Sequence, residues 1–88
     1  MKTDERKLAP RDIMAVFNTI YTHGEAQDGG KFYQGLQAES SFDGYTLMIS
    51  NRDSTLYLYF HNKFKVDSPD KRSLEDFYTK FNLILAEQ

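Results

Sequence analysis

The chain contains no cysteine, and this absence excludes several kinds of site. Without thiols there is no disulfide bond, no iron–sulfur cluster and no thiolate zinc site. No apolar run approaches the roughly 20 residues that a membrane-spanning helix needs. The first twelve residues, MKTDERKLAPRD, are charged and lack the apolar core of a signal peptide. We therefore expect a cytoplasmic protein that does not bind a membrane.

No part of the chain carries a block of charge of one sign. Eleven Lys and Arg residues stand against thirteen Asp and Glu, and the net charge is −2. This balance argues against a protein that binds nucleic acid by neutralising phosphates. The 88 residues suffice for one domain. Folding at this size buries only roughly 60% of the surface that the unfolded chain exposes. The hydrophobic core is therefore small, and the folded domain is expected to be only marginally stable.

An amphipathic helix is predicted from Pro10 to His23. We expect the nine residues before it to form a flexible tail. The helix should end at Gly24, because glycine readily takes the left-handed conformation that closes many helices, and residues 25–30 should be a polar connection. One face of the helix carries the apolar residues Ile13, Val16, Phe17, Ile20 and Tyr21.

A second helix is predicted near the end of the sequence. Two start signals compete there, namely Ser68 followed by Pro69, and Ser73 with Asp76 three residues later. We expect a turn at the first signal and the main helix from about the second. Its apolar stripe consists of Leu74, Phe77, Tyr78, Phe81, Ile84 and Leu85.

Three strands are predicted between the helices, over residues 32–38, 45–50 and 55–66. Asp43-Gly44 is a strong hairpin signal between the first two. In the first strand Gly35 indicates a bulge or a close backbone approach. Phe32, Leu36 and Ala38 are predicted to face the core, and Tyr33 and Gln37 to face away from it. In the other two strands, the alternation of apolar residues sets the register of pairing. On the core face, this register pairs Tyr45 with Phe60, Leu47 with Leu58, and Ile49 with Leu56. On the reverse face they set Met48 beside Tyr57 and Thr46 beside Tyr59.

The order of these elements predicts an α+β domain over residues 10–88. Its architecture is α-β-β-β-α, a three-stranded antiparallel meander with both helices packed on one face. The predicted core comprises Phe17, Ile20, Leu47, Ile49, Leu56, Leu58, Phe60, Phe77, Phe81 and Ile84.

The sequence contains the short motifs HGE at 23–25, GLQA at 35–38, FDGYT at 42–46, FHNKF at 60–64 and LEDF at 74–77. These motifs resemble those of a family of small gammaproteobacterial proteins known only as a domain of unknown function. The similarity spans most of the chain from His23 onward. It implies a stand-alone bacterial protein of the cytosol, and it offers no activity, cofactor or catalytic residue to transfer.

The two histidines do not form a recognisable chemical site. His23 and His61 lack the spacing of a standard metal site, so we predict neither a metal nor another cofactor. The proposed register brings His61 close to Asp43, and such a pair could act as a general base. No nucleophile is placed beside it. We therefore predict that the protein is not an enzyme, with the His61/Asp43 pair as the alternative.

The reverse face of the predicted sheet is the best candidate for a binding surface. Aromatic residues and Met are enriched at interface centres, which favours a protein-interaction module, most simply a homodimer. A merely solvated sheet face is the alternative. Lys63 and Lys65 beside the tyrosines also leave open binding of single-stranded RNA, or of a small ligand, on the Tyr/His face. The candidate interface residues are Tyr33, Met48, Tyr57, Tyr59 and His61.

Overall fold

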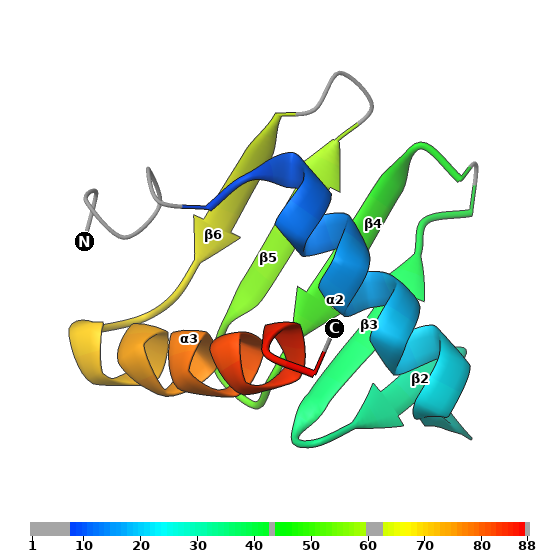
Figure 1. Cartoon of the computed structure of the whole chain (residues 1–88). Coiled ribbons are helices and arrows are strands. Elements are labelled where there is room, and N and C mark those ends of the chain that lie inside the picture. Colours follow the sequence, from blue (N-terminus) through cyan, green and yellow to red (C-terminus); the bar gives the residue numbers. More distant parts are fainter. Residues whose placement is uncertain (1–7, 43, 60–62, 88) are drawn as a thin grey trace.

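The computed structural model describes residues 8–42, 44–59 and 63–87 (Figure 1). Its helices are α2 (Pro10–His23) and α3 (Lys71–Leu85). They accompany one six-stranded antiparallel sheet in which each strand pairs with the next along the chain. The predicted α+β class is confirmed, and the three-stranded meander is wrong. The strands are β1 (Glu25–Gln27), β2 (Gly30–Tyr33), β3 (Leu36–Ser40), β4 (Thr46–Ser50), β5 (Thr55–Tyr59) and β6 (Phe64–Asp67).

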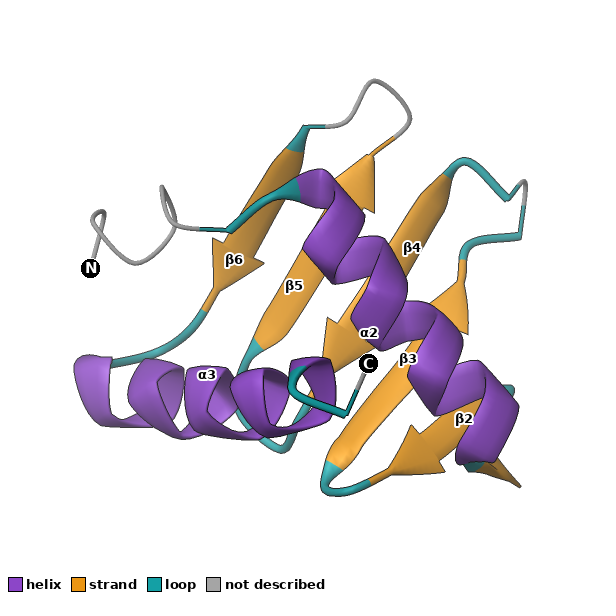
Figure 2. Cartoon of the chain, viewed as in Figure 1, coloured by secondary structure: helices purple, strands orange, loops and turns teal. Residues whose placement is uncertain are grey.

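Both helices lie on the same side of the sheet, as predicted (Figure 2). Side chains alternate along a strand, so only one face of each strand contributes to the core. Leu8 also packs against this core, although it belongs to the segment predicted as a tail. The buried apolar residues are Ile13, Val16, Phe17, Ile20, Leu36, Ala38, Ile49, Leu56, Leu58, Leu74, Phe77, Tyr78, Phe81 and Ile84.

Most of the predicted core is confirmed. Leu47 is only partly buried, and Phe60 lies outside the described residues. Tyr45, which was predicted to pair with Phe60, precedes β4 and is 62% exposed. The other pairs of the β4–β5 hairpin are confirmed, namely Leu47 with Leu58, Ile49 with Leu56, Met48 with Tyr57 and Thr46 with Tyr59.

The segment predicted as a polar connection forms the first hairpin instead. Gln27 on β1 pairs with Gly30 on β2. The two residues between them have positive φ, 51° at Asp28 and 84° at Gly29. Asp-Gly suits such a tight turn because Asp tolerates the left-handed region and Gly adopts it without steric cost. Residues 25–30 are therefore the beginning of the sheet.

A second tight turn divides the first predicted strand in two. Gln34 and Gly35 have φ of 53° and 87°, and Tyr33 pairs with Leu36 across them. Paired residues share a face of the sheet, so Tyr33 lies on the helix side with Leu36. Phe32 lies on the other side, paired with Gln37. The predicted orientations of Phe32 and Tyr33 are both wrong, because the bulge expected at Gly35 is a chain reversal.

The long third predicted strand is also two strands. Leu58 on β5 pairs with Phe64 on β6, and Leu56 pairs with Val66. Phe64 and Val66 pack against the core, because a hairpin keeps paired residues on one face. Tyr57 meanwhile pairs with Lys65 on the opposite face.

The helix termini differ from their sequence predictions. Helix α2 ends at His23 as expected, but Gly24 has an extended conformation with φ of −80°, and no left-handed residue closes the helix. Helix α3 begins after Asp70, whose Oδ1 accepts a hydrogen bond from the Ser73 N–H at 2.8 Å. Neither Ser68 nor Ser73 is the cap. Ser68 Oγ instead lies 2.9 Å from Oγ of the buried Ser54, which ties the β4–β5 turn to the start of α3.

The Asp70 cap makes the stability of α3 depend on pH. The hydrogen bond from the Ser73 N–H lowers the pKa of the Asp70 carboxyl. The cap therefore stabilises the fold above the unfolded-state pKa of about 3.9, and this contribution is lost as the pH falls through the lower folded-state pKa. We expect Asp70→Ala to lower the thermal midpoint at neutral pH, and Asp70→Asn, which retains an accepting oxygen, to lower it less.

Thermal melts monitored by circular dichroism, from neutral pH to below the folded-state pKa, measure this effect. The midpoints of the wild-type protein and Asp70→Asn should converge at the acidic end, because the carboxylate is then protonated. Equal midpoints of the wild-type protein and Asp70→Ala at neutral pH would show that the cap does not stabilise the helix.

Candidate functional site

The face of the sheet opposite the helices is called the open face below. Its central row consists of Glu39, Met48, Tyr57 and Lys65, which occupy directly paired positions on β3, β4, β5 and β6. Lys65 is exposed, and the other three side chains are half-buried. The row thus has an acidic end, an apolar and aromatic centre, and a basic end. No described helix covers it.

Tyr57 and Tyr59 form an ordered aromatic pair beside this row. Both follow the outward phase of β5, and their rings stack with centroids 6.1 Å apart and planes 9° apart. Lys65 Nζ lies 5.2 Å from the centroid of the Tyr57 ring, within range of a cation–π interaction. Tyr59 is 38% exposed. Tyrosines held in this way offer a large amphipathic contact area at little further loss of conformational freedom.

Phe32 on β2 is a separate apolar residue of the open face, paired with Gln37 and with 39% of its surface exposed. It borders a cavity of about 340 Å³ in which Gln37 Nε2 donates a hydrogen bond to the Gln27 carbonyl at 2.7 Å. Sequence reasoning missed Phe32 because it assigned this residue to the core. Interpreting Gln34-Gly35 as a turn would have found it. The cavity is lined by Gln27, Phe32, Gly35, Gln37, Ser50, Asn51 and Arg52.

The structure brings together Met48, Tyr57 and Tyr59 from the predicted interface set. Tyr33 is not among them, since its hydroxyl on the helix side of the sheet donates to Glu87 Oε1 at 2.8 Å. This hydrogen bond raises the pKa of the Tyr33 phenol. His61 lies outside the described residues, as does its proposed catalytic partner Asp43. The interface role of the open face and the absence of catalysis both stay predictions.

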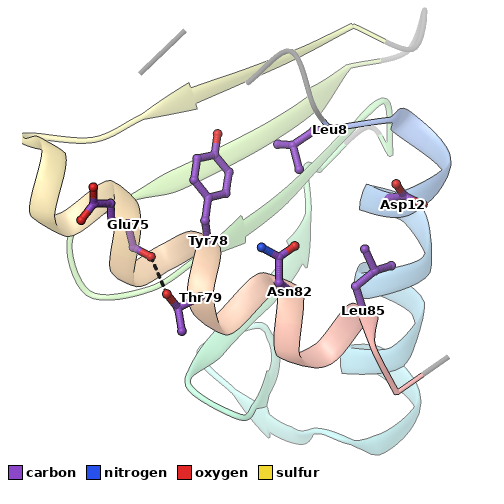
Figure 3. Close-up of a pocket in the computed structure, with 7 residues that line it drawn as sticks. All are labelled: Leu8, Asp12, Glu75, Tyr78, Thr79, Asn82 and Leu85. Carbon is purple, nitrogen blue, oxygen red and sulfur yellow. Dashed lines mark hydrogen bonds between the residues drawn. The ribbon is translucent and has the colours of Figure 1, made fainter. Parts of the chain in front are cut away.

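A larger cavity, of about 600 Å³, lies between the start of α2 and helix α3 (Figure 3). The hydrogen bond drawn there joins Thr79 Oγ1 to the Glu75 carbonyl at 2.9 Å, within the helix. The carboxylates of Asp12 and Glu75 give the cavity an acidic character that suits a small cationic ligand better than an anion. Its lining residues are Leu8, Asp12, Glu75, Tyr78, Thr79, Asn82 and Leu85.

Residues 8–42, 44–59 and 63–87 contain neither a cluster of metal ligands nor a helix that could cross a membrane. In these residues no three His, Asp or Glu side chains gather closely enough to hold a metal ion. Neither α2 nor α3 is long and apolar enough to cross a membrane, within the same part of the chain. The ion pair formed by described residues joins Lys80 Nζ to Asp76 Oδ2 at 2.6 Å, on the surface of α3.

A family model described as a protein of unknown function, DUF3081, matches residues 8–88. The chain belongs to the DUF3081 family. The predicted resemblance to a domain of unknown function is thereby confirmed. No curated protein and no solved structure matches the chain.

The match places both helices and all six strands within the DUF3081 domain. It begins at Leu8, the residue that packs against the core just before α2. The open face and both cavities therefore belong to the DUF3081 domain. The family description names no activity, so a function for this domain must be argued from its surface.

Proposed function

We propose that this DUF3081 domain is a protein-interaction module that binds its partner through the open face, most simply a second copy of itself. The observation that carries the proposal is the position of Met48, Tyr57 and Tyr59 next to one another on a face that no described helix covers. Aromatic residues and Met are enriched at the centres of interfaces, and contiguous exposed apolar patches commonly mark partner sites.

The small size of the domain supports the same proposal. A chain of 88 residues buries a modest share of its surface when it folds alone. Burial of the open face against a partner would add apolar contacts that exist only in the folded state, and binding of this kind stabilises a fold by mass action.

The edges of the sheet are less suited to association than its open face. Edge strand β1 has three residues, and edge strand β6 has four. Strand β6 also carries Lys65 and Asp67. Short strands and charged side chains are the features by which natural sheets avoid edge-to-edge pairing. A partner is therefore expected to stack on the open face.

Single-stranded RNA is the competing occupant of the open face. The stacked tyrosines and Lys65 would suit bases and phosphates. Against RNA stand the net charge of −2 and the carboxylate of Glu39 in the central row. Apolar contacts flanked by charges of both signs suit a protein partner better.

Sedimentation velocity of the unmodified protein tests this proposal. Across a concentration series from about 1 µM to about 1 mM, we expect the mass to rise from the 10.3 kDa of one chain to twice that value. A monomer at every concentration would contradict self-association. Titration with a labelled single-stranded oligonucleotide is the parallel measurement, and tight binding that weakens steeply with salt would favour the RNA alternative.

A further inference from the structure

We infer that the open face docks a second copy of this chain about a two-fold axis that runs parallel to the strands between β4 and β5. Glu39 of each copy then meets Lys65 of the other copy. This inference rests on the proposed function; it commits the partner to a second copy of the chain and adds the orientation of that copy.

The central row has the pattern that a two-fold axis requires. Two faces related by an isologous axis must present one self-complementary surface. An axis parallel to the strands keeps each position along the strands and reverses the strand order in the second copy. The row runs from Glu39 through Met48 and Tyr57 to Lys65. Reversal therefore sets acid against base at both ends and Met against Tyr at both central positions.

The two charges of the row cannot satisfy each other within one chain. Glu39 on β3 and Lys65 on β6 are three strand spacings apart, which is about 14 Å at the usual spacing of neighbouring strands. Lys65 instead lies against the Tyr57 ring. Each charge is thus available at the rim of an apolar centre, where interfaces place their charged residues.

The adjacent row supports the same axis. Gln37 on β3 and Asp67 on β6 are its outer residues, with Ser50 and Thr55 between them. Reversal sets the Gln37 amide against the Asp67 carboxylate, which can accept its hydrogen bond. It also sets the hydroxyl of Ser50 against that of Thr55. No facing pair in this row sets like charges together.

Two-fold axes perpendicular to the strands fit the open face less well. One that runs between the central row and the adjacent row would set Met48 against Ser50 and Tyr57 against Thr55, and so would separate the apolar centres. One that runs along the central row would set Glu39 against Glu39 and Lys65 against Lys65. Such contacts are costly when they are desolvated. A partner with charges of only one sign would likewise meet repulsion at one end of the row. The arrangement of charged and apolar residues together therefore favours a partner whose row runs in the opposite sense, and the chain itself supplies one.

Charge reversal tests this orientation directly. Glu39→Lys and Lys65→Glu should each raise the dimer dissociation constant at least about tenfold, because each variant creates two like-charge contacts in its homodimer. An equimolar mixture of the two variants restores both opposite-charge pairs in a heterodimer. Its dissociation constant should return to within about threefold of the wild-type value, measured by sedimentation or fluorescence anisotropy.

Glu25→Lys is the matched control, with the same change of charge on the open face. Glu25 lies on β1 opposite Phe32, beyond the four strands that the axis brings together. This variant should dimerise like the wild-type protein. Thermal melts of all three variants check that the fold is intact.

The outcomes separate the orientation from the proposed function. A wild-type dimer whose charge-reversal variants do not recover on mixing would overturn the axis and leave an interaction module of another geometry. A wild-type protein that is monomeric at all concentrations would overturn both. Recovery in the mixture, with little effect of Glu25→Lys, is the result that the axis predicts.

Discussion

Replacing Phe81 with alanine is expected to destabilise the domain by roughly 3–5 kcal/mol. Phe81 is fully buried, and its ring centroid lies 6.2 Å from that of Phe77 in the core. Removing the ring loses its transfer free energy and leaves a cavity that the two helices and the sheet can fill only in part. Small domains have a total stability of roughly 5–15 kcal/mol, so the variant should be partly or largely unfolded at 37 °C.

Urea denaturation followed by circular dichroism measures this loss, with Leu83→Ala as the control. Leu83 lies on the same helix but is 64% exposed, so its replacement should change the free energy of unfolding by no more than about 0.5 kcal/mol. A loss below about 1 kcal/mol for Phe81→Ala would mean that α3 is not docked on the sheet as described.

Replacing both Tyr57 and Tyr59 with serine should weaken self-association by roughly 2–4 kcal/mol, which is about 30-fold to 1,000-fold in the dissociation constant. The two stacked rings stand at the centre of the proposed contact, where truncation of an aromatic residue has its largest effect. Both side chains point away from the helices, so the monomer fold should persist. Any loss of thermal stability should depend on protein concentration.

Tyr21→Ser is the matched control for this double variant. Tyr21 on α2 is 36% exposed, close to the 38% of Tyr59, but it belongs to the helix layer. Its replacement should leave association unchanged. A double variant that unfolds even when dilute would show that Tyr57 and Tyr59 stabilise the single chain. Unchanged association of a well-folded double variant would exclude them from the interface.

The parts of the fold that could be predicted are those in which several local signals agree. The β4–β5 hairpin is an example, because Leu47 and Ile49 match Leu58 and Leu56 in phase, and a slip of one residue would expose all four. The helix faces were predictable for the same reason, since their apolar spacing matches the helical repeat.

The missed strands have two causes, namely one turn with an ambiguous signal and one strand that has no apolar phase. Gln34 is a poor residue for positive φ, so the turn at Gln34-Gly35 was interpreted as a bulge. Asp28-Gly29 carries the strongest hairpin signal, but the flanking strand β1 is short and fully exposed and has no apolar phase to reveal it. Because the turn at Gln34-Gly35 was not detected, Phe32 and Tyr33 were each assigned to the wrong face of the sheet.

The candidate site was predictable where it depends on strand phase alone. Met48, Tyr57 and Tyr59 follow from the β4–β5 register. The charge pattern of the central row could not be predicted from that register, because it also depends on how β3 and β6 pair with their neighbours. Both outer strands were obscured by the missed turns. Side chains brought together by several hairpins cannot be found until each hairpin is correct.

An isotope-filtered nuclear Overhauser experiment tests most directly whether two copies of the chain stack through their open faces. The sample mixes one ¹³C-labelled copy with one unlabelled copy, so only contacts between copies are recorded. If the two-fold axis is as proposed, we expect cross-peaks between the Met48 methyl group of one copy and the Tyr57 ring of the other. Cross-peaks that arise only from the helices, or none at concentrations near 1 mM where a dimer is expected, would contradict it.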